Sequence, residues 1–249
     1  MSRLNDRLYM GPAALEAFDL ATFPDSEEGR LGGNAFLAPG DLAYFEETLR
    51  RLRPEGGGPL VDLGCGRGAL GRHLAERLGM PLVGVDTSAV ALEQASLASS
   101  SVRARWVNCD FASLELETGG AAAAISLDGI HLAVDPRAML REVARVLMPG
   151  APLLFTVSVP RFREGALDWR NGLRAHHFEV LEYLEVSEPW HAWLRTKHER
   201  RLRNATELSQ RLEEREAAQA LEEAKMVLAG DPPWFKTQRR YRITARRAP

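Results

Sequence analysis

The hydrophobic pattern is most regular in the middle of the chain. From residue 60 to about residue 159, short runs of apolar residues alternate with segments whose apolar residues recur three or four positions apart. Continuous runs are typical of strands buried on both faces, and the wider spacing is typical of helices with one buried face. The alternation therefore predicts a parallel sheet covered on both faces, a doubly wound α/β fold. The runs that predict strands are 60–63, 82–85, 104–107, 121–127 and 153–159.

Helix signals lie before and between these runs. Residues 41–53 carry apolar side chains on one helical face, and the Gly- and Pro-rich stretch 54–59 ends that helix. Leucines four apart predict a second helix that stops at Gly79. A third begins at Asp135-Pro136, a capping residue followed by the residue favoured at the first helical position.

The last third of the chain is less regular. Residues 163–175 are predicted to be helical, 178–186 fit either a strand or a helix, and 240–245 alternate like a final strand. Between them lies the most polar stretch, 189–229, which predicts two helices with Asn204 as the cap between them. Its charges are expected to form a solvated face.

Composition narrows the class of protein. The 249 residues are 45% hydrophobic and 27% charged, which is typical of a globular protein with a real core. A formal net charge of -2 disfavours binding driven by attraction to nucleic acid or anionic lipid. The basic residues near the end, Lys236 to Arg247, are expected to be a solvated strand and tail.

Cysteines and termini suggest a compartment. Cys65 and Cys109 are too few for a disulfide framework or a zinc site, and we expect reduced thiols and no metal. No signal-like segment opens the sequence and no apolar run is long enough to span a membrane. We expect a cytoplasmic protein with no membrane partner. The sequence indicates no oligomeric state.

The candidate chemistry begins at a glycine-rich turn. Val61-Asp-Leu-Gly64-Cys-Gly66-Arg-Gly68 lies where the first predicted strand gives way to a helix. Alternate glycines permit a sharp turn and close approach of a ligand at the carboxyl edge of the sheet. The pattern Gly64-x-Gly66-x-x-Ala69 also satisfies a relaxed dinucleotide fingerprint, so a nicotinamide or flavin enzyme remains an alternative.

Acidic residues accompany three neighbouring strands. Asp62 lies inside the first strand, where a charge needs a reason. Asp86 ends the second strand and can accept hydrogen bonds from both hydroxyls of a ribose. Asp110-Phe111 follows the third strand and offers an acceptor and a ring where an adenine could lie, although Asp110 also fits a simple turn.

Together these residues resemble the class I S-adenosylmethionine-dependent methyltransferases. The resemblance covers about residues 58–160, with Leu60–Gly68 as the signature and later motifs at 126–129 and 145–150. It implies a Rossmann-like, seven-stranded, mostly parallel sheet with an N-terminal helical segment and a helical lid inserted before the last strand. It also implies S-adenosylmethionine as the cofactor.

The resemblance assigns roles to individual residues. Asp62 would face the methionine end of the cofactor, Asp86 the ribose, and Asp110 the exocyclic amine of adenine. Phe111 would cover one side of the adenine ring, and Leu127 would line the pocket near the methionine moiety. The floor would be Gly64, Cys65, Gly66 and Gly68, with Cys65 serving as a small residue rather than a reactive thiol.

Three residues are candidates for the catalytic end of the site. His131 follows the fourth strand and His191 follows the sixth, so both belong to the carboxyl edge if the fold is right. Tyr9 is a candidate lid residue near the methyl group. Packing roles remain the alternative for the two histidines.

The sequence thus predicts a domain organisation with a core and two lid segments. Residues 1–57 would form an N-terminal lid segment, 58–188 with 234–249 the cofactor-binding core, and 189–233 a helical lid.

The expected function is methyl transfer to O, N, S or C of a small metabolite. A nucleic-acid methyltransferase is a weaker alternative, since 126–129 departs from the proline-aromatic motif that stacks a target base. A third is a cofactor-binding protein with other chemistry, such as cyclisation.

Overall fold

The structure, a computed structural model, describes residues 38–55, 57–98, 102–160, 168–230 and 238–249. Tyr9, which the sequence places in a lid, lies outside the described residues. The structural statements below concern only those five ranges.

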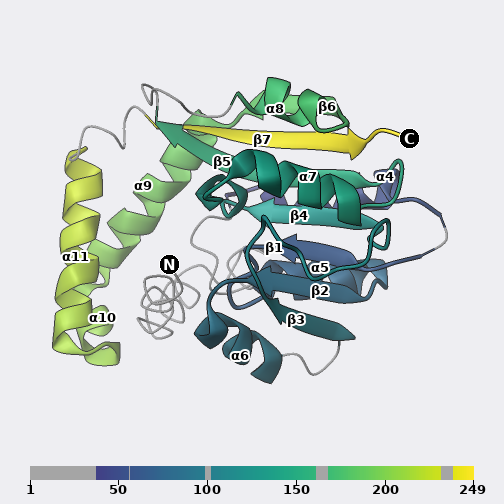
Figure 1. Cartoon of the computed structure of the whole chain (residues 1–249). Coiled ribbons are helices and arrows are strands. Elements are labelled where there is room, and N and C mark those ends of the chain that lie inside the picture. The colour runs from purple at the N-terminus through teal and green to yellow at the C-terminus, as the bar shows by residue number, and fades with distance from the viewer. Residues whose placement is uncertain (1–37, 56, 99–101, 161–167, 231–237) are drawn as a thin grey trace.

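One sheet forms the centre of the molecule (Figure 1). Its described strands follow the spatial order β3-β2-β1-β4-β5-β7-β6. Neighbours from β3 to β5 are parallel, and β7 is antiparallel to both β5 and β6. The predicted seven-stranded, mostly parallel sheet is therefore confirmed. The strands are β1 (Leu60–Leu63), β2 (Leu82–Asp86), β3 (Ala104–Asn108), β4 (Ala123–Leu127), β5 (Pro152–Pro160), β6 (Phe178–Glu185) and β7 (Gln238–Arg247).

This strand order defines where a ligand can bind. From β1 the chain proceeds outward to β2 and β3, then returns to the other side of β1 as β4. Such a reversal opens a crevice beyond the carboxyl ends of the two central strands, where doubly wound proteins bind their ligands. The glycine-rich turn follows β1 and therefore lies at this crevice.

Helices cover both faces of the sheet. Leucines of α4 and α5 pack with β1 and β2 on one face, and Arg72 of α5 donates a hydrogen bond of 3.3 Å to the carbonyl of Ala95 in α6. On the other face, residues of α7 and α8 pack together against β5. The helices are α4 (Asp41–Leu52), α5 (Ala69–Leu78), α6 (Ala89–Leu97), α7 (Pro136–Val146) and α8 (Trp169–Ala175).

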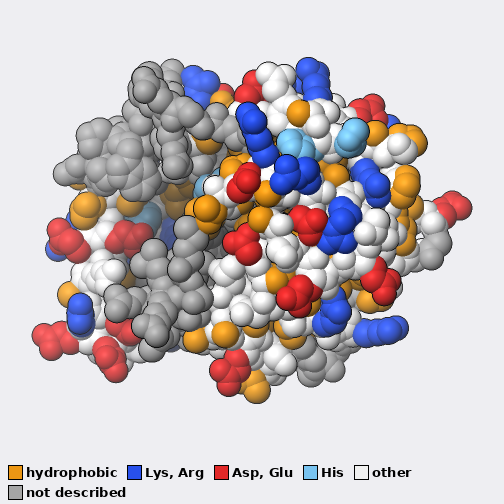
Figure 2. Space-filling model, viewed as in Figure 1, with side chains coloured by type: hydrophobic (Ala, Val, Ile, Leu, Met, Phe, Trp, Pro, Cys, Tyr) orange, Lys and Arg blue, Asp and Glu red, His pale blue; other side chains and the backbone are white. Residues whose placement is uncertain are grey.

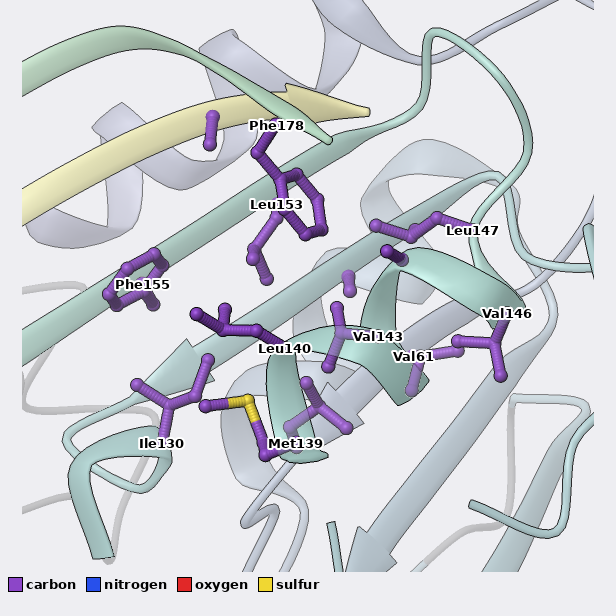
Figure 3. Packing of buried hydrophobic residues seen from close by; sticks show 14 of the residues in the cluster. Val61, Ile130, Met139, Leu140, Val143, Val146, Leu147, Leu153, Phe155 and Phe178 are labelled. Carbon is purple, nitrogen blue, oxygen red and sulfur yellow. The ribbon is translucent and has the colours of Figure 1, made fainter. Parts of the chain in front are cut away.

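The packing between α7 and the sheet is almost entirely apolar (Figure 3). Met139, Leu140 and Val143 of α7 are fully buried, as are Leu153 and Phe155 of β5. Full burial of such side chains contributes about 1.5–3 kcal/mol each. This core holds the strands, and therefore their carboxyl ends, in fixed relative positions.

The polar stretch before the last strand is helical, as predicted, but it forms three helices rather than two. They are α9 (Ser187–Arg203), α10 (Ala205–Arg211) and α11 (Glu214–Ala229). Asn204 separates α9 from α10, yet its side chain donates to the carbonyl of Arg200 and does not cap α10. Leu208 and Leu212 pack against alanines of α11, and this apolar cluster supports the additional break. Figure 1 shows α9 leaving the sheet and lying beside α11.

Three other boundaries refine the predictions. The fourth strand begins at Ala123, two residues later than expected, and Ala121 makes only an isolated bridge to Leu147. The ambiguous segment at 178–186 is a strand, β6, because its backbone pairs with β7. Helix α8 begins at Trp169 because the carboxylate of Asp168 accepts a hydrogen bond from the Asn171 amide as a cap.

In the part of the chain that the structure describes, no helix combines the length and apolar character needed to cross a lipid bilayer.

Candidate functional site

The glycine-rich turn begins directly after β1 and leads into α5. Gly64, Gly66 and Gly68 all have positive φ angles, 72°, 51° and 70°, and residues other than glycine rarely adopt such angles. The amides of Gly64 and Cys65 donate to the carbonyl of Val85 in β2, at 2.8 and 3.0 Å. The turn is therefore fixed to the neighbouring strand. Cys65 is buried within it, and burial raises the pKa of its thiol well above the ordinary value.

Asp86 joins the end of β2 to this turn. Its Oδ2 accepts a hydrogen bond from the Gly66 amide and its Oδ1 accepts one from the Ser88 amide, both at 2.9 Å. Each carboxylate oxygen can accept more than one hydrogen bond. The contacts therefore orient the carboxylate at the end of β2, beside the glycine turn.

Asp62 is a buried acid one strand away. Burial and, to a smaller extent, the nearby charge of Asp86 raise its pKa to about 7, although the Gly71 amide and Arg72 act in the opposite direction. Gly71 is required because a β-carbon there would lie 2.6 Å from Asp62 Oδ2. The fold thus brings two acidic groups together beside one turn, as the sequence predicted, and the protein must tolerate their repulsion.

The adenine-side candidates follow β3 on an exposed turn. Asp110 is exposed, and its Oδ1 accepts a hydrogen bond of 2.8 Å from the Ala112 amide, which is the simple-turn arrangement that the sequence left open. Phe111 is half-buried, and its ring would lie 3.3 Å from a β-carbon at Gly64. The phenyl ring is therefore against the glycine turn, whereas Asp110 is exposed.

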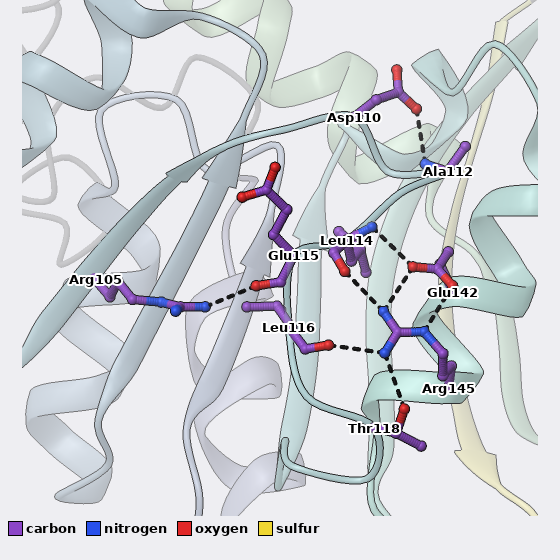
Figure 4. A network of polar contacts seen from close by, with 9 residues as sticks. All are labelled: Arg105, Asp110, Ala112, Leu114, Glu115, Leu116, Thr118, Glu142 and Arg145. Atoms are coloured by element: carbon purple, nitrogen blue, oxygen red, sulfur yellow. Dashed lines mark hydrogen bonds and ion pairs between the residues drawn. The ribbon is translucent and has the colours of Figure 1, made fainter.

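Polar contacts from α7 hold the loop that carries these residues (Figure 4). Glu142 accepts a hydrogen bond of 2.9 Å from the Leu114 amide. Arg145 donates 2.8 Å hydrogen bonds to the carbonyls of Leu114 and Leu116, and it also bonds both carboxylate oxygens of Glu142. This network satisfies the backbone of a loop that has no regular structure.

The end of β4 completes the edge of the crevice. Leu127 is buried and packs with the apolar cluster under α4 and α5. Gly129 lies against the turn, because a β-carbon at Gly64 would be 3.2 Å from its Cα. His131 follows in a short 3-10 helix, η1 (Ile130–Leu132), and is half-buried. The structure therefore places His131 two residues beyond a residue that contacts the glycine turn.

His191 belongs to the start of α9, as expected. Its ring lies 5.1 Å from that of Trp190, centre to centre. Trp190 and Leu194 are buried against Ala38, just before α4. The first turns of α9 thus pack on the segment that leads into the core.

One sequence prediction is wrong at this edge. Arg240 was expected to be solvated, but none of its side chain is exposed, and the side chain of Arg242 is only 17% exposed. Both side chains lie on the face of β7 that α4 covers. Arg240 Nη1 lies 3.0 Å from Asp41 Oδ2, and its Nη2 lies 3.1 Å from Asp128 Oδ2.

Arg240, Arg242 and the acids Asp41 and Asp128 form a buried charged cluster. Sequence reasoning did not predict the two acids of this cluster. Asp41 begins α4, and burial raises the pKa of its carboxyl despite the opposing effect of Arg240 and Arg242. Asp128 follows β4 directly. One sequence signal for the burial of these arginines was available. Arg240 and Arg242 alternate with Tyr241 and Ile243, which places the two arginines on the same face of the final strand. Nothing in the sequence named their partners, 199 residues away in the case of Asp41.

Comparison with known proteins gives the family. Residues 60–150 match the methyltransferase domain family. An uncharacterised methyltransferase of Mycobacterium tuberculosis is 29% identical over 123 residues, which cover 49% of this chain and 62% of that protein. The chain thus spans less than two thirds of the length of this relative.

Solved structures share the fold over most of the chain. The [4+2]-cyclase SpnF has a TM-score of 0.71 and 21% identity, over 100% of this chain and 96% of its own. Phosphoethanolamine N-methyltransferase 2 of Haemonchus contortus, solved with S-adenosyl-L-methionine, has a TM-score of 0.71 and 19% identity, over 93% of this chain and 57% of its own.

The sheet order, the glycine turn with its acids and the domain match define the class of this protein. Residues 60–150 match a methyltransferase domain, and the strand order and glycine turn agree with the class I S-adenosylmethionine-dependent methyltransferases, whose cofactor is S-adenosylmethionine. The resemblance noted in the sequence is confirmed, and the match decides against the dinucleotide-binding alternative.

Proposed function

We propose that this protein transfers a methyl group from S-adenosylmethionine to O, N, S or C of a small molecule. The observation that carries the proposal is the convergence of Asp62 and Asp86 beside the turn at Gly64–Gly68. An anion at Asp62 suits the ammonium of a methionine moiety, and the oriented carboxylate of Asp86 suits a ribose. The bare backbone of Gly64 and the ring of Phe111 suit a flat base.

The residues fit the cofactor at both ends of the proposed site. When bound, the cofactor supplies an electrophilic methyl group on a sulfonium. The protein's task is then to hold an acceptor in line, and positioning alone can supply about 7–11 kcal/mol of the barrier. We assign His131 and His191 as candidates to orient or deprotonate the acceptor. Tyr9 is a third candidate, from the segment before α4.

The predicted lid segment 1–57 includes α4, which packs on the sheet as part of the core. We further propose that the part of this segment before α4, together with residues 189–233, closes over the acceptor. The packing of Trp190 and Leu194 on Ala38 supports this, because it joins the start of α9 to the segment entering α4. The core would then be residues 58–188 with 234–249, and α4 would belong to it as well. Exclusion of water by such a lid favours transfer to the intended acceptor over side reactions.

Calorimetry tests the cofactor assignment. We expect S-adenosylmethionine and S-adenosylhomocysteine to bind, and Asp86→Ala to weaken both by at least about tenfold, the effect of losing charged hydrogen bonds. Glu179→Ala, an acid on the exposed side of β6, is the matched control and should bind normally. Stronger binding of NADH than of either nucleoside would overturn the assignment.

Transfer assays test the acceptor class. With methyl-labelled cofactor, label should enter the small-molecule fraction of a metabolite extract and not tRNA or DNA. The face shown in Figure 2 supports this, because acidic and basic side chains are interspersed on it. Label entering the polymer would contradict the small-molecule proposal.

A second candidate function is cofactor binding with chemistry other than methyl transfer, such as cyclisation. The likeness to SpnF over the whole chain is a likeness of fold, and it makes this candidate worth testing. Tight cofactor binding without label transfer to any fraction would favour it.

A further inference from the structure

Asp128 has an unusual environment for an acidic side chain. Its side chain is only 3% exposed. Oδ2 forms the ion pair with Arg240, while Oδ1 is buried and has no hydrogen-bond partner among the described residues. Buried acceptors are nearly always paired, and an unpaired one calls for an explanation.

The backbone of Asp128 is also held in a rare conformation. Its φ of 48° is positive, and its amide donates a 3.0 Å hydrogen bond to Thr156 Oγ1 of β5. Few residues other than glycine adopt such angles, and those that do are concentrated at functional sites. This conformation occurs directly after the last residue of β4.

Arg240 fixes the carboxylate from the other side. Besides Asp128 it binds Asp41, and it donates to Thr156 Oγ1 at 3.3 Å. Its guanidinium also lies 5.6 Å from the centre of the Trp190 ring at the base of α9. Through Arg240 of β7, the Asp128 carboxylate is therefore held in place by contacts that also involve α4, β5 and α9.

This charge lies next to the proposed cofactor turn. Asp128 is bonded directly to Gly129, which contacts Gly64, and it follows Leu127 at the strand end. Asp62 and Asp86 serve the cofactor in the proposed function and Asp110 is the adenine-side candidate, whereas Asp128 is a buried acid of this edge to which no role has been assigned.

We propose that Asp128 binds the methyl acceptor: its Oδ1 accepts a hydrogen bond from the hydroxyl or amine group that receives the methyl. The acceptor class is thus a compound whose nucleophilic atom is an O–H or N–H donor. In the transfer, the lone pair of that atom forms the bond to the methyl carbon, the carbon–sulfur bond breaks with its electrons left on sulfur, and the proton passes to water. This inference rests on the proposed function.

Two cofactor analogues test whether Asp128 Oδ1 lies beside the transferred methyl group, and this test does not require the acceptor to be known. Sinefungin carries an amine at the position of the transferred methyl, whereas S-adenosylhomocysteine carries nothing there. We expect sinefungin to bind the full-length protein at least about tenfold more tightly, because one hydrogen bond to a charged group is worth that much. Calorimetry at pH 7.5 measures both affinities.

Asp128→Asn keeps the size of the side chain and removes its charge. The preference for sinefungin should fall at least fivefold, while affinity for S-adenosylhomocysteine changes less than about threefold. Asp135→Asn is the matched control, since Asp135 is the N-cap of α7 and Asn caps equally well. It should keep the full preference.

The outcomes separate the two proposals. If neither analogue binds the wild-type protein, the proposed function fails and this inference falls with it. If S-adenosylhomocysteine binds but sinefungin shows no preference, or Asp128→Asn retains it, only this inference is overturned. Should Asp128→Asn not fold, a crystal structure of the wild-type protein with sinefungin decides: the amine must lie within about 3.2 Å of Asp128 Oδ1.

Discussion

At the scale of single residues, the fold strongly raises the pKa of the Asp62 carboxyl, which its position in the sequence does not reveal. Its pKa of about 7 means that the folded protein holds a proton there that the unfolded chain releases near the ordinary value of 3.8. The folded state therefore holds more protons than the unfolded state between about pH 4 and 7. Because stability falls with pH wherever this holds, Asp62 makes the protein less stable as pH rises through that window.

Replacing Asp62 by Asn tests this directly. The variant should lose the contribution of Asp62 to the pH dependence, worth up to about 4 kcal/mol across the window, and should be more stable than the wild type at pH 8. Affinity for S-adenosylhomocysteine should fall at least about tenfold, because the anion for its ammonium is gone. Urea unfolding at pH 5 and pH 8, with calorimetry at pH 8, gives both results. An unchanged pH slope would contradict the burial argument.

Glycine residues at the two ends of α5 make a second comparison at this scale. Both Gly68 and Gly79 have positive φ, but a β-carbon at Gly68 would lie 2.3 Å from the Trp106 ring, whereas Gly79 has open space. Gly79→Ala should cost about 1 kcal/mol for its backbone, and Gly68→Ala about 2–4 kcal/mol because steric overlap is added. Thermal and urea unfolding measure the difference; equal costs would show that the Trp106 contact is unimportant.

At the scale of elements, α7 does more than cover the sheet. Its buried face packs on β1 and β5, and its last turn carries Arg145, which bonds the loop between β3 and β4. One helix thus fixes both the strands and the loop that bears Phe111. The cofactor's adenine end is predicted to depend on a residue that does not touch it.

Arg145→Met should therefore reduce stability by about 1–3 kcal/mol, because the carbonyls of Leu114 and Leu116 lose their donor. It should also weaken S-adenosylhomocysteine several-fold. Arg141→Met, an exposed position on the same helix, should change stability by less than about 0.5 kcal/mol. Chemical denaturation and calorimetry of both variants check this, and equal behaviour would show that the loop is held in another way.

At the scale of the whole molecule, Arg240 connects segments from nearly the full described chain. It reaches Asp41 at the start of α4 and Asp128 after β4, and its backbone amide and carbonyl bond Ser187 and Val186 at the base of α9. The arrangement ties the helical insertion to the core through one buried cation. Paired burial of this kind makes the loss of one partner costly.

Arg240→Met should destabilise the protein by about 3–5 kcal/mol, since two buried carboxylates lose their cation. Arg246→Met, on the same strand but in an exposed pair with Glu179, should cost less than about 1 kcal/mol. Differential scanning calorimetry of the full chain compares the two. Similar melting temperatures would mean that the Arg240 cluster contributes no more than a surface ion pair.

The sequence by itself determined the alternation of strands and helices, because hydrophobic spacing is a local property that burial on two faces imposes. It also determined the glycine turn and its neighbouring acids, since positive φ and strand ends leave local signals at Gly64 and Asp86. The break at Asn204 was predicted, whereas the second break, between α10 and α11, was not, because the packing of Leu208 and Leu212 against α11 accompanies it.

Only the tertiary structure decided which charges are buried and what they face. The basic residues of β7 look like a solvated tail in sequence, and it is the position of β7 between β5 and β6, under α4, that buries Arg240. The raised pKa of Asp62 and the burial of Asp128, whose Oδ1 has no hydrogen-bond partner in the described ranges, likewise arise from neighbours distant in the chain. Burial and electrostatic coupling depend on separations in space, which a linear pattern does not encode.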